Sequence, residues 1–243
     1  MKHKIETTSA SLHIMAMLFM LCDHLWATVV PGNEWLTCVG RLAFPIFAFL
    51  IVEGYFHTRD LKKYVLRLLL FAALSEIPFN LMVSGRLLYP FHQNVLWTFL
   101  MALGLIHWNE RVKNAKRALR ILVACGSVLL GSLVGLITFV DYFHAGVLTV
   151  LVFYFFRERN WVNRVMQLLC LACINLEVLG GLSYAFTLFG VSFEFPQQGF
   201  ALLALIPVWL YRGRPGLRSP ALKWANYLFY PVHMLILGLL ALL

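Results

Sequence analysis

The 243-residue chain is 61% hydrophobic and 13% charged, with a mean hydropathy of +0.78. Soluble globular chains average about 25% charged residues, so the composition excludes a soluble globular protein and indicates a membrane protein. The net charge of +9 does not indicate nucleic-acid binding, because Lys and Arg gather in alternate connections between apolar segments, as expected from the positive-inside rule. The apolar runs are too long and continuous for the alternating strands of a membrane barrel.

The apolar segments predict an all-α fold: a polytopic membrane helix bundle of about nine transmembrane helices in a single integral-membrane domain, residues 1–243. The first apolar run is too long for a signal peptide, so we expect an uncleaved helix. The aromatic segment 180–195 is open to three interpretations, namely a tenth span, a re-entrant piece or an interfacial helix. The predicted spans are 11–31, 36–56, 63–83, 93–109, 118–140, 144–157, 162–179, 198–211 and 222–242.

The loop charges predict the orientation of these spans. The connections around Glu34, Arg86, Asp141 and Glu194 are poor in Lys and Arg. The alternation places the N-terminus and the basic connections of this multi-pass protein in the cytoplasm. The basic connections contain Lys2 and Lys4, then residues 57–63, 109–120, 157–164 and 211–218.

Several ionisable residues fall inside the predicted spans, beginning with the adjacent pair Asp23 and His24. Each such residue costs about 2.5–3.5 kcal/mol to insert, so intramembrane charges usually mark a function. At a rise of 1.5 Å per residue, His24 and Arg41 lie roughly 8–10 Å below the outer face, Glu76 about 20 Å from the cytoplasmic side and His233 some 17 Å into the last helix. These depths predict that the four residues converge in the middle-to-outer part of the bilayer.

Histidine is the commonest general base, because its pKa lies near the working pH, so His24 is the candidate catalytic base. Neighbouring side chains on a helix diverge by about 100°, so Glu76 is better placed than Asp23 to orient His24. Asp23 is expected to pair with Arg41 or to cap another helix. A purely structural ion pair is the alternative interpretation of Arg41.

Other polar residues have a structural and a functional interpretation. His92, Gln93 and Asn94 either cap a helix or line an acceptor entrance and supply an oxyanion donor. His233 either lines the pocket or satisfies carbonyls freed by Pro231. Glu53 is expected to meet a nearby cation, and Asp141 and His144 are interpreted as outer-turn residues. The cation candidates for Glu53 are Lys62, Lys63 and Arg67.

Five stretches resemble the TraX family of integral-membrane proteins, and they keep the order of the family over almost the whole chain. The resemblance implies a relation to transmembrane acyltransferases, which use a histidine in the first helix and cytoplasmic acyl-CoA. It makes His24 the presumed base and Arg41, Glu76 and His233 pocket residues whose roles are inferred. It also implies acetyl-CoA or another acyl-CoA as co-substrate and a bacterial plasma membrane as the location. The acceptor stays open: a peptide N-terminus, a glycan or a lipid. The matching stretches are 18–24, 40–50 with Glu53 and Gly54, 75–80, 92–95 and 230–233.

The phosphates of coenzyme A need cytosolic cations. The first candidates are Arg59, Lys62, Lys63 and Arg67, with Arg157 and Arg159 as alternatives. No metal is expected, because Cys170 and Cys173 share a helix face without other ligand residues nearby. The expected partners are therefore the lipid bilayer, acyl-CoA and the acceptor, with no nucleic acid.

Three other functions compete with acyl transfer. A proton-coupled transporter or flippase would also use intramembrane acids and histidines, although the halves show no inverted repeat. An intramembrane protease would use Ser183 with His233, on the weak signal of a Gly-x-Ser triplet. An assembly scaffold for surface appendages gives no reason for His24 in hydrocarbon. Acyl transfer is therefore the preferred prediction.

Overall fold

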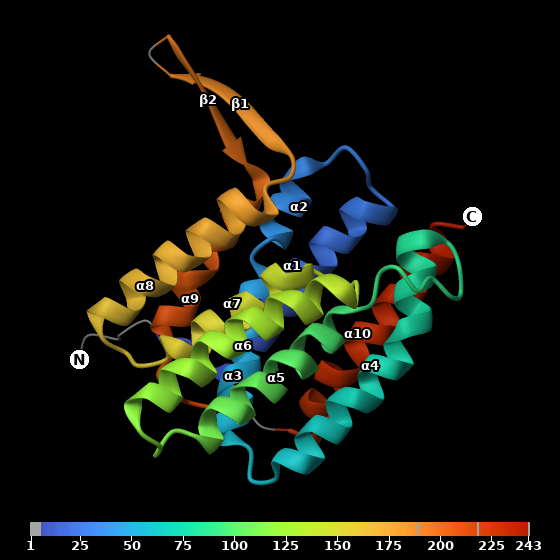
Figure 1. Cartoon of the computed structure of the whole chain (residues 1–243). Coiled ribbons are helices and arrows are strands. Elements are labelled where there is room, and N and C mark those ends of the chain that lie inside the picture. Colours follow the sequence, from blue (N-terminus) through green and yellow to red (C-terminus); the bar gives the residue numbers. More distant parts are fainter. Residues whose placement is uncertain (1–5, 189, 218, 243) are drawn as a thin grey trace, which may run out of the picture. The chain divides into compact units, whose positions relative to one another are not determined.

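The computed structural model describes residues 6–188, 190–217 and 219–242, and it is mostly helical with one β-hairpin (Figure 1). The predicted helical fold class is confirmed in this part of the chain. Lys2, Lys4 and Arg218, which contributed to the predicted orientation, lie outside the described residues. Two compact units divide the chain: the first contains Met1–Leu50 and Glu158–Phe229, and the second contains Ile51–Arg157 and Tyr230–Leu243.

The first unit begins with helix α1 (Ser9–Thr28), which starts at a capping box. The Thr8 hydroxyl accepts a hydrogen bond from the Ser11 backbone, and the Ser11 hydroxyl accepts one from the Thr8 backbone, so the exposed N–H groups of the first turn are satisfied. Helix α2 (Glu34–Gly40) ends at Arg41, and α3 (Ala43–His57) follows it. The single helix predicted over 36–56 is therefore interrupted at Arg41.

The remainder of the first unit contains segment 180–195, for which the sequence allowed three interpretations. Helix α8 (Trp161–Ala172) continues as a π-helix (Cys173–Leu179), and later a 3-10 helix (Gln197–Ala204) leads into α9 (Leu205–Leu210). Between them, β1 (Ser183–Leu188) pairs antiparallel with β2 (Val191–Pro196), as the orange arrows in Figure 1 show. The interpretations of 180–195 as a tenth span or an interfacial helix are therefore wrong.

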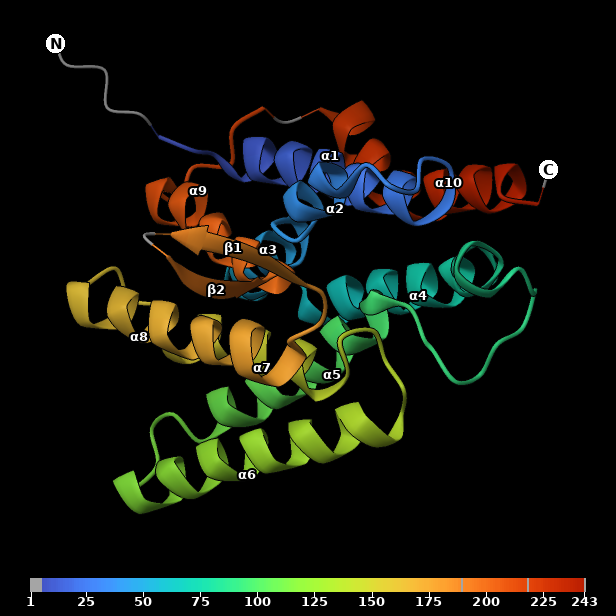
Figure 2. The same cartoon turned by 90° about the horizontal axis from the view of Figure 1, so that it is seen from above.

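The second unit is built around α5 (Val95–Arg111), which packs against α4 (Leu61–Ser84), α6 (Arg117–Ile137) and α7 (Phe143–Phe155) (Figure 2). The last helix, α10 (Pro220–Leu240), enters this unit at Tyr230. A Cβ at Gly238 would lie 2.9 Å from the Met82 backbone nitrogen, so this glycine lets α10 approach α4 closely. Polar residues on α4, α5 and α10 are thereby brought into one unit.

Five segments are long and apolar enough to cross a membrane: Ser9–Thr28, Glu34–His57, Leu61–Ser84, Arg117–Ile137 and Trp161–Leu179. In Arg117–Ile137 only 22% of the most apolar window is buried, and Leu122, Leu129 and Leu133 are all more than half exposed. An exposed leucine face of this kind is suited to contact with lipid. The other four predicted spans are not among the segments found in this part of the chain, and they stay predictions.

Candidate functional site

The first unit holds the predicted pair of Asp23 and Arg41. Arg41 Nη2 lies 2.5 Å from Asp23 Oδ1, and Thr37 donates its hydroxyl to the same oxygen at 2.7 Å. Arg41 Nη2 also donates to the Thr37 hydroxyl at 2.8 Å, so the three side chains form a closed cluster. A Cβ at Gly40 would collide with the Asp23 side chain, which explains why a glycine stands there. The expected pairing of Asp23 with Arg41 is confirmed.

His24 is half-buried on α1, and it directly follows Asp23, the ion-pair partner of Arg41. Its backbone carbonyl accepts a hydrogen bond from the Thr28 hydroxyl at 2.6 Å, which supports the last turn of the helix. Two residues further on, the buried indole N–H of Trp26 has no hydrogen-bond partner among the described residues. A buried donor without a partner is costly and suits a bound polar group. The catalytic role of His24 stays a prediction.

The second unit holds Glu76 in a polar cluster between α4 and the start of α5. Asn94 donates a hydrogen bond from Nδ2 to Glu76 Oε2, and Trp97 Nε1 donates to the same oxygen at 3.0 Å. Asn94 Nδ2 also donates to the Ala72 carbonyl, while Asn94 Oδ1 accepts from the Leu96 backbone N–H at 3.1 Å. Asn94 is therefore the N-cap of α5, which confirms the helix-cap interpretation of this residue. Both hydrogens of its Nδ2 are engaged, so none is left for the predicted oxyanion.

The other carboxylate oxygen of Glu76, Oε1, is buried without a hydrogen-bond partner in the described part of the chain. Two more polar atoms of α4 share this state, the Ser75 hydroxyl and Asn80 Oδ1, on residues that are 0% and 2% exposed. Buried acceptors normally have a partner, and leaving one unsatisfied costs about 1–3 kcal/mol. Such atoms indicate a bound proton, water or ligand at the site.

His92 forms a dyad with Asp141 across the loops at the same end of α5. Its Nε2 lies 3.2 Å from Asp141 Oδ1, and the imidazole contacts the Phe79 ring edge to face at a centroid distance of 5.1 Å. The hydrogen bond that His92 donates to the Asp141 carboxylate raises the pKa of His92 above its ordinary value, although partial burial opposes this shift. A carboxylate that orients an imidazole is the arrangement used in general base catalysis.

The loop that carries Asp141 is held in an unusual conformation. Gln93 forms two backbone hydrogen bonds to it, with the Phe139 carbonyl at 2.8 Å and the Asp141 N–H at 2.9 Å, and Thr98 donates its hydroxyl to the Asp141 carbonyl. Non-glycine residues rarely adopt positive φ, and each instance costs about 1–3 kcal/mol unless the surroundings enforce it. Strain concentrated beside a His–Asp pair favours a functional loop. The residues with positive φ are Phe139, Tyr142 and Phe143.

We expect the His92–Asp141 pair to make stability depend on pH. Because the folded state raises the pKa of His92, the pair stabilises the fold below about pH 6.5, and this contribution disappears as the pH rises through the raised pKa. The side chains are 30% and 27% exposed, so the effect is at most about 1 kcal/mol. Thermal unfolding in detergent between about pH 5.5 and 8.5 should show a smaller pH dependence for His92→Gln. The control His107→Gln, which removes a histidine bound to the Tyr55 hydroxyl, should behave as the wild type.

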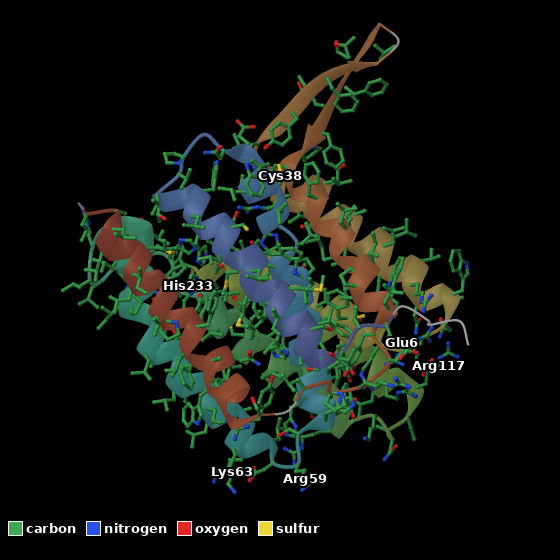
Figure 3. The ribbon with its side chains drawn as sticks, turned by 180° about the vertical axis from the view of Figure 1, so that it is seen from behind. Glu6, Cys38, Arg59, Lys63, Arg117 and His233 are labelled. Atoms are coloured by element: carbon green, nitrogen blue, oxygen red, sulfur yellow. The ribbon has the colours of Figure 1, made fainter. Side chains whose placement is uncertain are left out.

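Tyr230 and His233 on α10 belong to the same unit. The Tyr230 side chain hydrogen-bonds to the Val95 backbone and lies within electrostatic range of Glu76 and Asp141. His233, labelled in Figure 3, is 6% exposed and stands one turn further along the helix, with its ring 6.1 Å from that of Tyr230. The buried position of His233 agrees with a pocket residue, and its role stays a prediction.

Glu53 has a different partner from the one expected. Its Oε1 accepts a hydrogen bond from Arg157 Nε at 2.7 Å, and its Oε2 lies 3.6 Å from His57 Nδ1. The guanidinium of Arg157 stacks on the Phe56 ring at 4.1 Å, which fixes it beside the carboxylate. The predicted pairing with Lys62, Lys63 or Arg67 is therefore wrong, because α7 ends beside α3 and supplies a nearer cation.

The four cations predicted to bind coenzyme A surround the turn between α3 and α4, where Figure 3 labels Arg59 and Lys63. Lys63 pairs with the N-cap residue Asp60 at 3.3 Å. The hydrogen bond from the Lys63 backbone holds the pKa of Asp60 below its usual range. Arg59 and Lys62 are exposed and Arg67 is half-buried. Their role in donor binding stays a prediction.

The structure thus brings the predicted residues together in two groups. Asp23, His24 and Arg41 belong to the first unit, whereas Glu76, the 92–94 segment and His233 belong to the second. The predicted convergence of all four intramembrane charges stays a prediction. No cluster of three metal-ligating side chains occurs among the described residues. Sequence reasoning missed Thr37 and Trp97, although each lies one helical turn from a predicted residue. It interpreted Asp141 as an outer-turn residue and did not predict its contact with His92.

Comparison with known proteins decides the family. The model of the TraX protein family matches residues 8–241, nearly the whole chain. The chain belongs to the TraX family. All the candidate site residues lie within this TraX match, and the family resemblance expected from the sequence is confirmed.

Relatives of this TraX family member come from bacteria. A protein of Dichelobacter nodosus described as "Probable fimbrial assembly protein FimC, serogroup H1" is 28% identical over 250 residues, covering 98% of this chain and 97% of its own length. "Protein TraX" of Escherichia coli is 26% identical over 233 residues, covering 94% and 85%. No solved structure matches the chain. Together with the apolar helices, these relatives indicate a bacterial membrane protein.

Proposed function

We propose that this protein is a membrane-embedded acyltransferase that moves an acetyl group from acetyl-CoA to an amine or hydroxyl acceptor. In the reaction the bond between the acyl carbon and the CoA sulfur breaks, and a bond from that carbon to the acceptor nitrogen or oxygen forms. The acceptor loses one proton, which passes through a base of the protein to the CoA thiolate. Other acyl-CoA donors would react in the same way.

The residues have distinct roles in this proposal. His24 removes the acceptor proton, because histidine is the side chain most often used as a general base. Arg41 is the candidate donor to the oxyanion that develops on the thioester carbonyl. Asn94 is not, because both hydrogens of its Nδ2 are engaged by the Ala72 carbonyl and Glu76 Oε2. Asp23 holds Arg41 in place within the cluster that includes Thr37. Glu76 relays or stores a proton, because only one of its two oxygens is engaged.

The unpaired oxygen of Glu76 supports a chemical role most directly. A carboxylate that served only to cross-link α4 and α5 would have both oxygens satisfied, since leaving one buried and unpaired costs free energy. Asn94 and Trp97 instead bind a single oxygen and leave the other directed at no protein group among the described residues. The second oxygen is therefore available to a proton or to a polar group of the substrate, which supports a chemical role for Glu76.

The acceptor that we propose is a subunit of a surface appendage. One relative is described as a fimbrial assembly protein, and its whole length aligns with this chain. Such a subunit would present a free amino terminus or a hydroxyl to the membrane site. Acetyl-CoA would reach the site from the cytoplasm, where the basic connections are expected.

Purified protein in nanodiscs should release CoA thiol from acetyl-CoA only when a peptide with a free amino terminus, a glycan or a lipid-linked acceptor is added. Appearance of the acetylated acceptor in mass spectrometry completes the test. Absence of acceptor-dependent thiol release with all three classes would overturn the proposal. A proton-coupled transporter, which the unpaired Glu76 oxygen would also suit, would consume no thioester.

Glu76→Gln should lower the acyl-transfer rate by about tenfold or more, because an amide cannot carry the proton. The amide oxygen still accepts from Asn94 and Trp97, so the melting temperature should change little. Glu34→Gln, which changes an exposed acid on α2, is the matched control and should keep the wild-type rate. A Glu76→Gln variant with full activity would show that the carboxylate is only structural.

A further inference from the structure

A groove lies in the second unit at the end of α5 that is remote from Glu76 and His92. It has a volume of about 500 Å³ and is lined by residues from the end of α5, the α5–α6 turn, the start of α6 and the end of α7. Ligand pockets in proteins have volumes of about 300–1,000 Å³, so the groove suits a small molecule better than a single ion. The 17 residues of α5 separate it from the Asn94 cluster by about 25 Å along the helix axis.

The groove is lined by three cations, two of which have no acidic partner in the described part of the chain. Lys113 pairs with Glu110 Oε2 at 3.1 Å. Glu110 Oε1 accepts a hydrogen bond from the Tyr154 hydroxyl at 3.0 Å, so both oxygens of this acid are already engaged. Arg117 and Arg120 line the same groove, and they lie one turn apart on α6. Two unpaired arginines on one wall create a local excess of positive charge.

The backbone at the start of α6 adds to this positive potential. The N-cap residue Lys116 makes no side-chain hydrogen bond to the first turn. The N–H groups at the start of a helix lack partners within the helix, and the helix dipole places partial positive charge there. Arg117 and Arg120 lie in the first turn of α6. Their guanidinium groups and the free backbone N–H groups therefore both attract an anion to this end of the groove.

The remaining wall of the groove is apolar. Ile121 and Ala124 continue the stripe of Arg117 and Arg120 along α6, and Phe155 faces them from the end of α7. The exposed leucines of α6, such as Leu122, lie on the adjoining face. A ligand that fits both walls carries a phosphate at one end and an extended or apolar chain at the other, since guanidinium groups bind phosphate bidentately.

We propose that this groove binds the phosphate of an amphiphilic phosphate ester, with Arg117 and Arg120 as its ligands. Two sources share this chemistry: the nucleotide end of acyl-CoA, which rests on the proposed function, and the headgroup of an anionic phospholipid. The basic α5–α6 connection is expected at the cytoplasmic face, where both are available. Figure 3 shows Arg117 well apart from Arg59 and Lys63, so this is a different site from the cation cluster predicted to bind coenzyme A.

The test compares Arg117→Gln/Arg120→Gln with the wild type in two binding assays that need no turnover. In phosphatidylcholine nanodiscs, CoA binding is measured by titration calorimetry. In neutral detergent, retention of phosphatidylglycerol over phosphatidylcholine is measured by native mass spectrometry. The double variant should bind at least one of the two phosphate esters about tenfold more weakly, and the assay that changes identifies the source. Unchanged binding of both overturns the proposal, whether or not the protein is an acyltransferase.

Two further variants distinguish binding in the groove from non-specific attraction to positive surface charge. Arg111→Gln/Lys116→Gln removes the same charge from the same turn, but neither side chain lines the groove, so binding should stay as in the wild type. An equal loss in this control would overturn the proposal. Ala124→Phe fills the groove without changing the charge and should weaken the same ligand as the arginine variant. Retained binding by Ala124→Phe would contradict a ligand within the groove.

Discussion

Replacement of His24 by alanine is expected to reduce acceptor-dependent release of CoA thiol by about 100-fold or more, while the protein still folds. General base catalysis contributes about 10²–10⁴ in rate, and the proposal assigns this step to the His24 imidazole. Initial rates at saturating acetyl-CoA, measured for wild type and variant in the same nanodiscs, give the ratio. The melting temperature of each preparation is measured as well. An unchanged melting temperature shows that a lower rate comes from the loss of the imidazole and not from unfolding.

His13→Ala provides a matched control on the same helix. His13 is also a histidine of α1, and its Nδ1 hydrogen-bonds to the Ser9 carbonyl at 2.8 Å, so its local role is structural. The control should retain most of the wild-type rate. Full activity in His24→Ala, or equal losses in the two variants, would remove His24 from the role of base and leave His92 with Asp141 as the histidine–carboxylate pair to test next.

The contacts of the candidate site that could be predicted from the sequence join residues that lie close together along the chain. Asp23 and Arg41 are 18 residues apart, on two helices joined by a short turn, so the chain itself brings them together. Asn94 stands just before an apolar run, where an Asn is favoured as an N-cap. In both places a polar residue in apolar sequence had few available partners. The contacts of Asp23 and Asn94 were therefore predictable in kind.

Contacts between distant segments could not be predicted in this way. Glu53 and Arg157 are 104 residues apart, and His92 and Asp141 are 49 apart. Which helices are neighbours depends on the close packing of small residues, such as Gly131 against α5 and α7, and a hydropathy pattern carries no such information. Glu53 was therefore assigned to the cations nearest in sequence, although a cation from α7 is nearer in space.

The β-hairpin was missed for a different reason. The two strands flank Gly190, which has a positive φ of 79°. Alternating side chains on either side of a turn glycine are a recognisable sequence pattern for a hairpin. Its residues are nearly all apolar or aromatic, however, so the segment has the composition of a span as well as the alternation of strands. Tyr184 anchors the hairpin, because its hydroxyl lies 3.3 Å from Cys38 Sγ and accepts from Gln197 Nε2 at 3.2 Å.

Asp23→Ala is expected to destabilise the protein by about 3 kcal/mol, the second large effect that the structure predicts. The substitution leaves the Arg41 guanidinium, only 14% exposed, with Thr37 as its remaining partner in the cluster. A buried charge that loses its partner costs about 3–5 kcal/mol, and the partial exposure of this pair places the loss at the lower end. Unfolding in detergent titrated with SDS measures the change. Glu34→Ala, an exposed acid on α2, should change stability by less than about 0.5 kcal/mol.

A double-mutant cycle then separates the ion pair from the other contacts of each residue. Because each single variant loses the Asp23–Arg41 ion pair and the double variant loses it only once, Asp23→Ala/Arg41→Ala should lose at least about 1 kcal/mol less stability than the sum of the single variants. Additive losses would show that the two side chains act independently. If the pair serves to hold α1 beside α2, the double variant should recover stability but not activity, because Arg41 is also a candidate oxyanion donor. Recovery of both would reduce Arg41 to a structural counter-ion and remove it from oxyanion stabilisation.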